Sequence, residues 1–157
     1  MKKIFIVANW KSNKTESEAK NWLSAMLSLK DQNLSNKEII VCPSFVHLPV
    51  MKAFIKEHQL PIKLGAQNIS SFDEGAYMGE VSARQIKEFA QYVIIGHSER
   101  RKYLHETNDD VMAKLKQLIK NNITPILCVS NMEQMDYYFS KDTIISDKTD
   151  DIIFVYE

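Results

Sequence analysis

The sequence predicts an α/β fold in which a parallel sheet of six strands is covered by helices. Two observations favour this fold. Short runs that are apolar throughout recur along the chain, and amphipathic helical segments lie between them. Strands without polar alternation are typical of parallel sheets that helices cover. The expected strands begin near residues 4, 38, 62, 92, 124 and 152.

Length and composition indicate one globular domain over residues 1–157. The chain is 45% hydrophobic and 25% charged, and its 20 basic residues equal its 20 acidic ones. This balance gives no electrostatic case for nucleic acid or a membrane surface as a partner. Cys42 and Cys128 lie in apolar runs, so buried free thiols are expected. Without a signal-peptide pattern or a transmembrane-length run, we expect a cytoplasmic protein.

Capping residues delimit the first expected elements. An apolar run over residues 2–8 predicts a buried strand. The pattern Thr15-x-x-Glu18 is a capping box, so a helix is expected to begin there. One face of this helix is expected to carry Ala19, Trp22, Leu23, Met26 and Leu27. A second buried strand is expected over residues 39–42, and a second helix follows it.

Prolines and glycines mark the middle of the chain. Pro49 is tolerable only in the first turn of the second helix. A brief strand over residues 62–64 precedes a long loop from Gly65 to Gly79, and loops of this length usually serve function or contacts. A second capping box, Ser82-x-x-Gln85, predicts a short helix that runs through Ile86 and Phe89.

The remaining elements follow the same alternation. After the fourth strand, over residues 92–95, Thr107 and Asp110 predict a helix that ends at the Asn121-Asn122 pair. A fifth strand is expected over residues 123–129, and a sixth over residues 152–156. Between them, Met132, Met135, Tyr138 and Phe139 have helical spacing for at most a short helix, packed in the core, before a polar stretch over residues 141–151.

Polar side chains follow three of these strands at their carboxyl ends. They are Asn9 and Lys11 after the first, His97 after the fourth and Glu157 after the sixth. In parallel sheets these ends share one edge, where catalytic groups gather. A carboxylate and an imidazole can move protons, and an ammonium can stabilise an oxyanion. Taken singly, the alternatives stay open: a loop lysine, a turn histidine and a surface carboxylate.

Other polar residues point to no cofactor. Glu99 is expected to orient its neighbours or to pair with a cation. His47, His58 and His105 are interpreted as surface or packing residues. No cluster of histidine, cysteine and carboxylate has zinc-like spacing, and no glycine-rich nucleotide pattern occurs, so neither a metal nor a nucleotide cofactor is expected.

Five motifs in a fixed order, spread across the chain, argue against a chance match. They are Asn9-Trp10-Lys11, Gly65-Ala66-Gln67-Asn68, Glu74-Gly75-Ala76-Tyr77-Met78-Gly79-Glu80, Gly96-His97-Ser98-Glu99-Arg100-Arg101 and Pro125-Ile126-Leu127-Cys128-Val129. Through these motifs the chain resembles the triosephosphate isomerase family. The resemblance implies the first six strand units of an incomplete (β/α)8 TIM barrel.

The resemblance also implies a function in glycolysis and gluconeogenesis. The family interconverts dihydroxyacetone phosphate and glyceraldehyde 3-phosphate without a cofactor, through an enediolate. Asn9 and Lys11 would contact the substrate, and Lys11 would also stabilise its charge. His97 would be the neutral electrophile and Glu157 the base, a pairing already known of the family. Ser98 and Glu99 would support them.

Three departures from the family pattern bear on these expectations. Ser130-Asn131 stand where the family has Gly-Glu, and Met78 stands where many relatives have Thr. The sequence also ends at the expected base, before the family's phosphate-binding segment. A fragment of a longer product, one piece of an assembly, or a non-catalytic remnant would each explain this. The function alternatives are therefore an isomerase of four-carbon sugar phosphates and an interaction protein, and a homodimer through the Gly65–Gly79 loop is expected.

Overall fold

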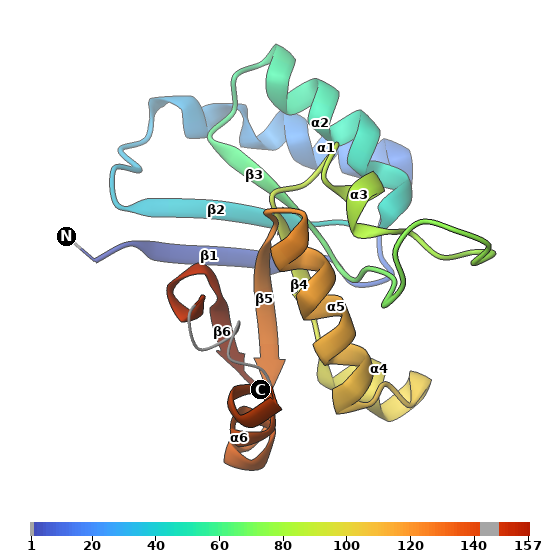
Figure 1. Cartoon of the computed structure of the whole chain (residues 1–157). Coiled ribbons are helices and arrows are strands. Elements are labelled where there is room, and N and C mark those ends of the chain that lie inside the picture. Colours follow the sequence, from blue (N-terminus) through green and yellow to red (C-terminus); the bar gives the residue numbers. More distant parts are fainter. Residues whose placement is uncertain (1, 142–147) are drawn as a thin grey trace. The chain divides into compact units, whose positions relative to one another are not determined.

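The computed structural model describes residues 2–141 and 148–157. Strands alternate with helices along the chain, which confirms the predicted α/β class, and the strands begin within a residue of their expected positions (Figure 1). The strands are β1 (Ile4–Asn9), β2 (Lys37–Cys42), β3 (Ile62–Ala66), β4 (Tyr92–Ile95), β5 (Thr124–Val129) and β6 (Ile153–Tyr156). The α-helices are α1 (Glu16–Ala25), α2 (Leu48–Glu57), α3 (Ala83–Ile86), α4 (Ser98–Leu104), α5 (Asn108–Lys120) and α6 (Met132–Lys141). Short 3₁₀ turns are η1 (Met26–Asp31), η2 (Phe45–His47) and η3 (Thr149–Asp151).

The chain forms two compact units. The first holds the residues up to Gln67 together with residues 89–92, and the second holds residues 68–88 and the chain from residue 93 onward. Residues 142–147 of the expected polar stretch lie outside the described residues.

In the first unit, β1, β2 and β3 are neighbours in that order, and all are parallel. Ile4 pairs with Lys37, and Ile39 pairs with Ile62. Because each strand pairs with the next one along the chain, the connections between them are helices, and Figure 1 shows α1 and α2 with these strands. The core of the unit includes the fully buried residues Ala19, Leu23, Ile40, Val41, Leu48 and Met51.

The expectation that the first strand is buried is wrong, because the first three residues of β1 are exposed and the last three are only half-buried. Ile4, Phe5 and Ile6 are 46%, 38% and 46% exposed. β1 stands at the end of the strand order, beside β2, so it forms an edge of this sheet. An apolar run predicts burial only where a neighbouring element covers it, and the sequence of the run does not contain that information.

In the second unit, β4, β5 and β6 are neighbours in that order. β5 and β6 are parallel, with Leu127 opposite Phe154. Helix α5 contacts β5, and α6 contacts both α5 and β5. The largest fully buried side chains of this unit include Ile95, Leu115, Leu118, Ile126, Leu127 and Tyr138.

Both expected capping boxes form, and the predicted helix start at Thr107 and Asp110 is a third. At each one the side chain of the N-cap residue accepts from the third helical residue, whose own side chain accepts from the N-cap backbone: Thr15 with Glu18, Ser82 with Gln85, and Thr107 with Asp110. Helix α5 also ends as predicted, because Asn122 adopts a φ of 56°, in the left-handed region that Asn tolerates.

Three helices differ from expectation. Helix α3 ends at Ile86 and does not reach Phe89. Helix α4 was not predicted, since its charged residues show no apolar period. Helix α6 has ten residues and is longer than predicted. Tyr138 is buried, as expected. Met132 is 71% exposed, so the prediction that it packs in the core is wrong.

Both cysteines are free and buried, as predicted. Burial raises the pKa of the Cys42 thiol to about 12, so this thiol stays protonated at neutral pH. Among the described helices, none combines the length and the apolar character that crossing a membrane requires.

Candidate active site

A tight turn between β4 and α4 presents His97. Gly96 adopts a φ of +73°, and a Cβ atom built there would lie 3.0 Å from the carbonyl oxygen of Cys128. Only glycine fits such a position without strain. His97 then serves as the N-cap residue of α4, and its carbonyl oxygen accepts from the backbone N–H of Arg100 at 2.9 Å.

The hydrogen bonds of the His97 imidazole indicate which ring nitrogen carries the hydrogen. Nδ1 of His97 accepts from the backbone N–H of Glu99 at 3.2 Å, so this nitrogen presents a lone pair. In the neutral ring the hydrogen is then on Nε2. Nε2 lies 3.4 Å from Oε2 of Glu157, and the His97 side chain is 16% exposed.

Glu157 is held beside His97 by backbone and side-chain contacts. Its N–H donates to the carbonyl of Val129 at 3.0 Å, which continues the pairing of β6 with β5. The hydroxyl of Ser98 donates to Oε2 at 2.8 Å. Burial opposes ionisation, but hydrogen bonds from Cys128 and Ser98 lower the pKa of Glu157 below its ordinary value. An ionised carboxylate thus faces an imidazole, which is the arrangement of a base beside a proton donor.

Glu99 lies near the other side of the ring. Its Oε2 is 3.8 Å from Nδ1 of His97, too long for a hydrogen bond. The contact that orients the ring comes from the Glu99 backbone N–H instead.

Asn9 and Lys11 lie together in the first unit, after β1. The backbone N–H of Lys11 donates to Oδ1 of Asn9 at 3.0 Å, and Lys11 adopts a φ of 53°. Its carbonyl accepts from Nε2 of Gln67 at 2.9 Å and from Oγ of Ser44 at 3.2 Å. A non-glycine residue at positive φ is uncommon and persists where neighbours hold it.

The structure therefore brings the predicted residues together in two groups. His97, Ser98, Glu99 and Glu157 lie together in the second unit, and Asn9 and Lys11 lie together in the first.

Gln67 is a supporting residue that our reading of the residues did not single out. Its Nε2 donates to the carbonyl oxygens of Lys11 and Cys42, both at 2.9 Å, and so ties the ends of β1 and β2 together. The available signal was its place in the Gly65-Ala66-Gln67-Asn68 motif.

A buried ionic cluster in the second unit was also missed. Glu106 accepts from Nζ of Lys114 and, at 2.9 Å, from Nε of Arg100. The Glu106 and Lys114 side chains are 3% and 7% exposed. Burial opposes ionisation of Glu106, yet these two bonds lower its pKa. No sequence spacing predicts the pairing of Glu106 with Lys114, because Glu106 lies in the turn before α5 and Lys114 lies within that helix.

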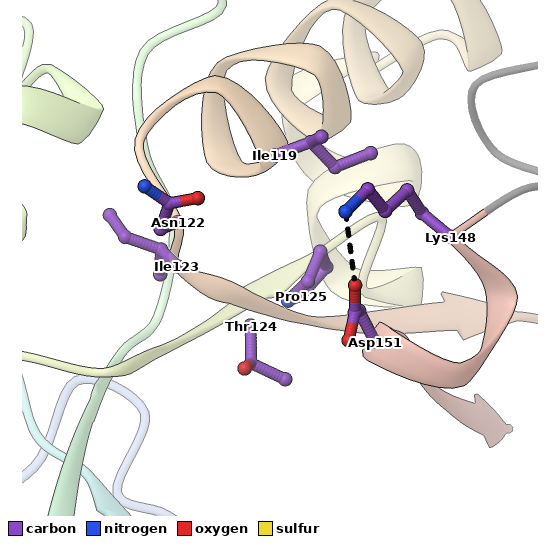
Figure 2. A pocket seen from close by; sticks show the side chains of 7 residues that line it. All are labelled: Ile119, Asn122, Ile123, Thr124, Pro125, Lys148 and Asp151. Carbon is purple, nitrogen blue, oxygen red and sulfur yellow. Dashed lines mark ion pairs between the residues drawn. The ribbon is translucent and has the colours of Figure 1, made fainter.

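A cavity of about 210 Å³ lies at the amino end of β5. Figure 2 shows Lys148 and Asp151 beside it, 3.6 Å apart, with Thr124 and Pro125 from the strand. Glu157 bonds to Val129 at the opposite end of β5, so this cavity does not belong to the histidine–glutamate site. Among residues 2–141 and 148–157, no group of three histidine, cysteine or carboxylate side chains could hold a metal ion.

Comparison with known proteins covers nearly the whole chain. The family model described as triosephosphate isomerase matches residues 4–156. A triosephosphate isomerase of Trichodesmium erythraeum is 40% identical over 157 residues, which is 99% of this chain and 64% of that protein. One from Thermus thermophilus is 45% identical over 130 residues, covering 82% of this chain and 50% of that protein.

A triosephosphate isomerase of Mesomycoplasma hyorhinis is 40% identical over 147 residues, covering 91% of this chain and 58% of that protein. The chain thus spans less than two thirds of the length of these curated relatives. The match over residues 4–156 shows that this chain belongs to the triosephosphate isomerase family.

Proposed function

We propose that the whole protein is a triosephosphate isomerase that interconverts dihydroxyacetone phosphate and D-glyceraldehyde 3-phosphate without a cofactor. Family membership supports the substrate, because the relatives carry this name. The observation that carries the proposal is the 3.4 Å separation between Nε2 of His97 and Oε2 of Glu157. A carboxylate and a neutral imidazole at this distance can act on adjacent atoms of one small substrate.

In the proposed reaction, Glu157 and His97 move protons between neighbouring carbons and oxygens. The Glu157 carboxylate removes a proton from C1 of dihydroxyacetone phosphate, and the electron pair shifts to the carbonyl to give an enediolate. His97 donates from Nε2 to the O2 oxyanion and recovers a proton from the O1 hydroxyl. Glu157 then returns the proton to C2, which completes the aldehyde. Atoms and electrons balance without a redox partner.

Lys11 and Asn9 are proposed as substrate-binding residues. An ammonium group near the developing oxyanion would lower the energy of the enediolate. The support for Asn9 is its side-chain bond to the Lys11 backbone, which orders the loop after β1. Ser98 and Glu99 are proposed to support Glu157 and His97 through the contacts described above.

The test is an isomerase assay of the protein encoded by the complete reading frame. His97→Gln and Glu157→Asp should each lower kcat by roughly two to four orders of magnitude, because each removes or displaces a proton-transfer group. His58→Gln and Glu133→Asp are matched controls outside the site and should leave kcat close to that of the unaltered protein. An unchanged rate in either site variant would show that its role is misassigned.

The same assay separates the alternatives. A panel of sugar phosphates compared by kcat/KM should favour the triose substrates. Preference for a four-carbon ketose phosphate would replace the substrate proposed here. Absence of isomerase activity towards every member of the panel would favour the interaction protein instead.

We also propose one barrel domain, a homodimer and a cytoplasmic location for the whole protein. The uninterrupted family match supports one domain, and the balanced charge supports the absence of nucleic-acid and membrane partners. The loop between β3 and α3 supports the dimer. At its tip Met78 is fully exposed, Tyr77 is 43% exposed, and the Tyr77 ring stacks on Phe72 with centroids 4.3 Å apart.

A further inference from the structure

Arg101 donates hydrogen bonds to the main-chain carbonyl groups of Gly96 and His97. Its backbone N–H donates to the carbonyl of His97 at 3.3 Å. Its side-chain Nε donates to the carbonyl of Gly96 at 2.8 Å. These two carbonyl groups flank the Cα atom of His97, so the position of Arg101 fixes the peptide groups from which the imidazole projects.

The guanidinium of Arg101 is itself held by two helices. Nη1 donates to Oδ1 of Asn108, the first residue of α5, at 2.7 Å. Nη2 donates to the hydroxyl oxygen of Tyr138 on α6 at 2.6 Å. The three side-chain contacts use the planar fork of the guanidinium, which a lysine could not reproduce.

Tyr138 is fully buried, and its hydroxyl lies within this network. The hydroxyl also donates to Oδ1 of Asn108, at 3.3 Å. Burial raises the pKa of Tyr138, although the bond from Arg101 opposes the rise, so the hydroxyl is protonated at neutral pH. Leaving a buried hydroxyl without hydrogen-bond partners costs free energy, so the bonds that join Tyr138 to Arg101 and Asn108 are expected to stay formed.

Close packing transmits the position of the guanidinium to the turn. A Cβ atom built on Gly96 would lie 3.0 Å from Nη2 of Arg101 and 3.0 Å from the carbonyl oxygen of Cys128. Gly96 therefore fills the gap between the guanidinium and β5. A shift of the guanidinium towards the turn would therefore press on Gly96.

We infer that Tyr138 is a positioning residue for His97, acting through the Arg101 guanidinium and the Gly96 carbonyl. The inference rests on the proposed function, in which His97 is the electrophile. The hydroxyl of Tyr138 fixes Nη2, the guanidinium fixes the Gly96 peptide, and that peptide sets the direction in which Nε2 faces Glu157. Tyr138 does not touch the reacting atoms.

The first test measures the ¹⁵N chemical shifts of the His97 imidazole and does not depend on catalytic activity. Long-range ¹H–¹⁵N spectra of labelled protein distinguish the two ring nitrogens, and loss of signals in His97→Gln assigns those of His97. The unaltered protein should show a hydrogen on Nε2 and a lone pair on Nδ1. In Tyr138→Phe the two nitrogen shifts of His97 should move towards each other, because a ring that is no longer held at the Glu99 N–H populates both neutral tautomers.

Tyr137→Phe is the matched control, since the Tyr137 hydroxyl bonds to Asp109 on the surface. It should leave the His97 shifts unchanged. If Tyr138→Phe does not fold, Arg101→Lys replaces it, because lysine cannot hold all three acceptors. Unchanged His97 shifts in a folded Tyr138→Phe or Arg101→Lys protein would overturn the inference.

The second test uses the isomerase assay of the complete reading frame. Tyr138→Phe should lower kcat by about tenfold, since small displacements of a catalytic group are costly. KM should stay within about twofold of the unaltered value, because substrate binding groups are untouched. An unchanged kcat would overturn the inference. If the unaltered protein has no isomerase activity, the proposed function fails, and the His97 shifts alone decide the positioning role.

Discussion

The hydroxyl of Ser98 donates a 2.8 Å hydrogen bond to Oε2 of Glu157, which joins the first residue of α4 to the residue after β6. This bond favours the ionised carboxylate, as does the bond from Cys128, against the opposing effect of burial.

Ser98→Ala should therefore raise the pKa of Glu157. The lowered pKa means that the folded state gains stability from this group above its ordinary pKa and loses it as the pH falls through the folded value. In the variant this gain should be smaller and its loss should be complete at a higher pH, because the folded pKa is raised while the unfolded pKa is unchanged. A ¹³C-carboxyl NMR titration measures the shift directly. Ser140→Ala is the control, since the Ser140 hydroxyl bonds to a surface carbonyl; an unmoved Glu157 titration in Ser98→Ala would contradict the assignment.

Lys114→Met should destabilise the protein by about 3–5 kcal/mol, because it leaves the buried Glu106 carboxylate with a single cationic partner. Oε2 of Glu106 already lacks a hydrogen-bond partner among the described residues. Lys20→Met removes a comparable partner of Glu16, but both side chains are more than half exposed, so its cost should be far smaller. Urea unfolding of both variants gives the comparison, and equal costs would argue against a buried ionised pair.

Gly96→Ala should destabilise the second unit more than Gly79→Ala does. Both glycines have positive φ, at +73° and +83°, so both variants carry backbone strain of roughly 1–2 kcal/mol. Only at Gly96 does the added Cβ meet other atoms, at 3.0 Å, whereas nothing lies within 4 Å at Gly79. Thermal unfolding of the two variants isolates the steric part; a larger loss at Gly79 would refute this account of the turn.

Met78→Glu should convert the proposed dimer of the complete protein to a monomer. Met78 is fully exposed at the loop tip, and a buried carboxylate in an apolar partner surface is costly. Sedimentation at micromolar concentration measures the change. Glu133→Gln, on the exposed start of α6, is a control for altered charge and should remain dimeric. A monomer before substitution would end the claim.

A polypeptide of residues 1–157 alone should have little isomerase activity. Binding energy from the non-reacting phosphate normally holds the reacting carbons and excludes water, and the family's phosphate-binding segment lies outside this sequence. In that polypeptide the base would also be the terminal residue, where order is usually poor. A misplacement of about 1 Å can cost on the order of a hundredfold. Turnover within about tenfold of the complete protein would contradict this reasoning.

Local chemistry made much of this fold predictable. The helix starts at Thr15, Ser82 and Thr107 follow from side chains that bond to their own backbone, which needs no tertiary context. Strand positions follow from runs of apolar residues for the same reason. The existence of α4 could not be predicted, because a histidine N-cap and a charged first turn carry no periodic signal. The length of α3 could not be predicted either.

The site was predictable only where residues lie next to a strand end. His97 and Glu157 were predicted in this way and through the family motifs, and the structure places them beside each other. The contacts that hold them could not be identified, because Ser98 and Glu157 are 59 positions apart in the chain and Arg101 and Tyr138 are 37 apart. Such pairs depend on which face of a helix packs inward, and that is settled by the tertiary fold.

The parallel pairing of β1 with β2, and of β2 with β3, also bears on synthesis by the ribosome. Each strand finds its partner in the next strand to emerge, so the register of the first unit requires no residue later than β3. Helix α1, started by its own capping box, can form in the interval. During translation, domains generally fold from the amino terminus. A nascent chain stalled after β3 should therefore already protect the β2 amides from exchange, while the apolar edge of β1 remains available to a chaperone.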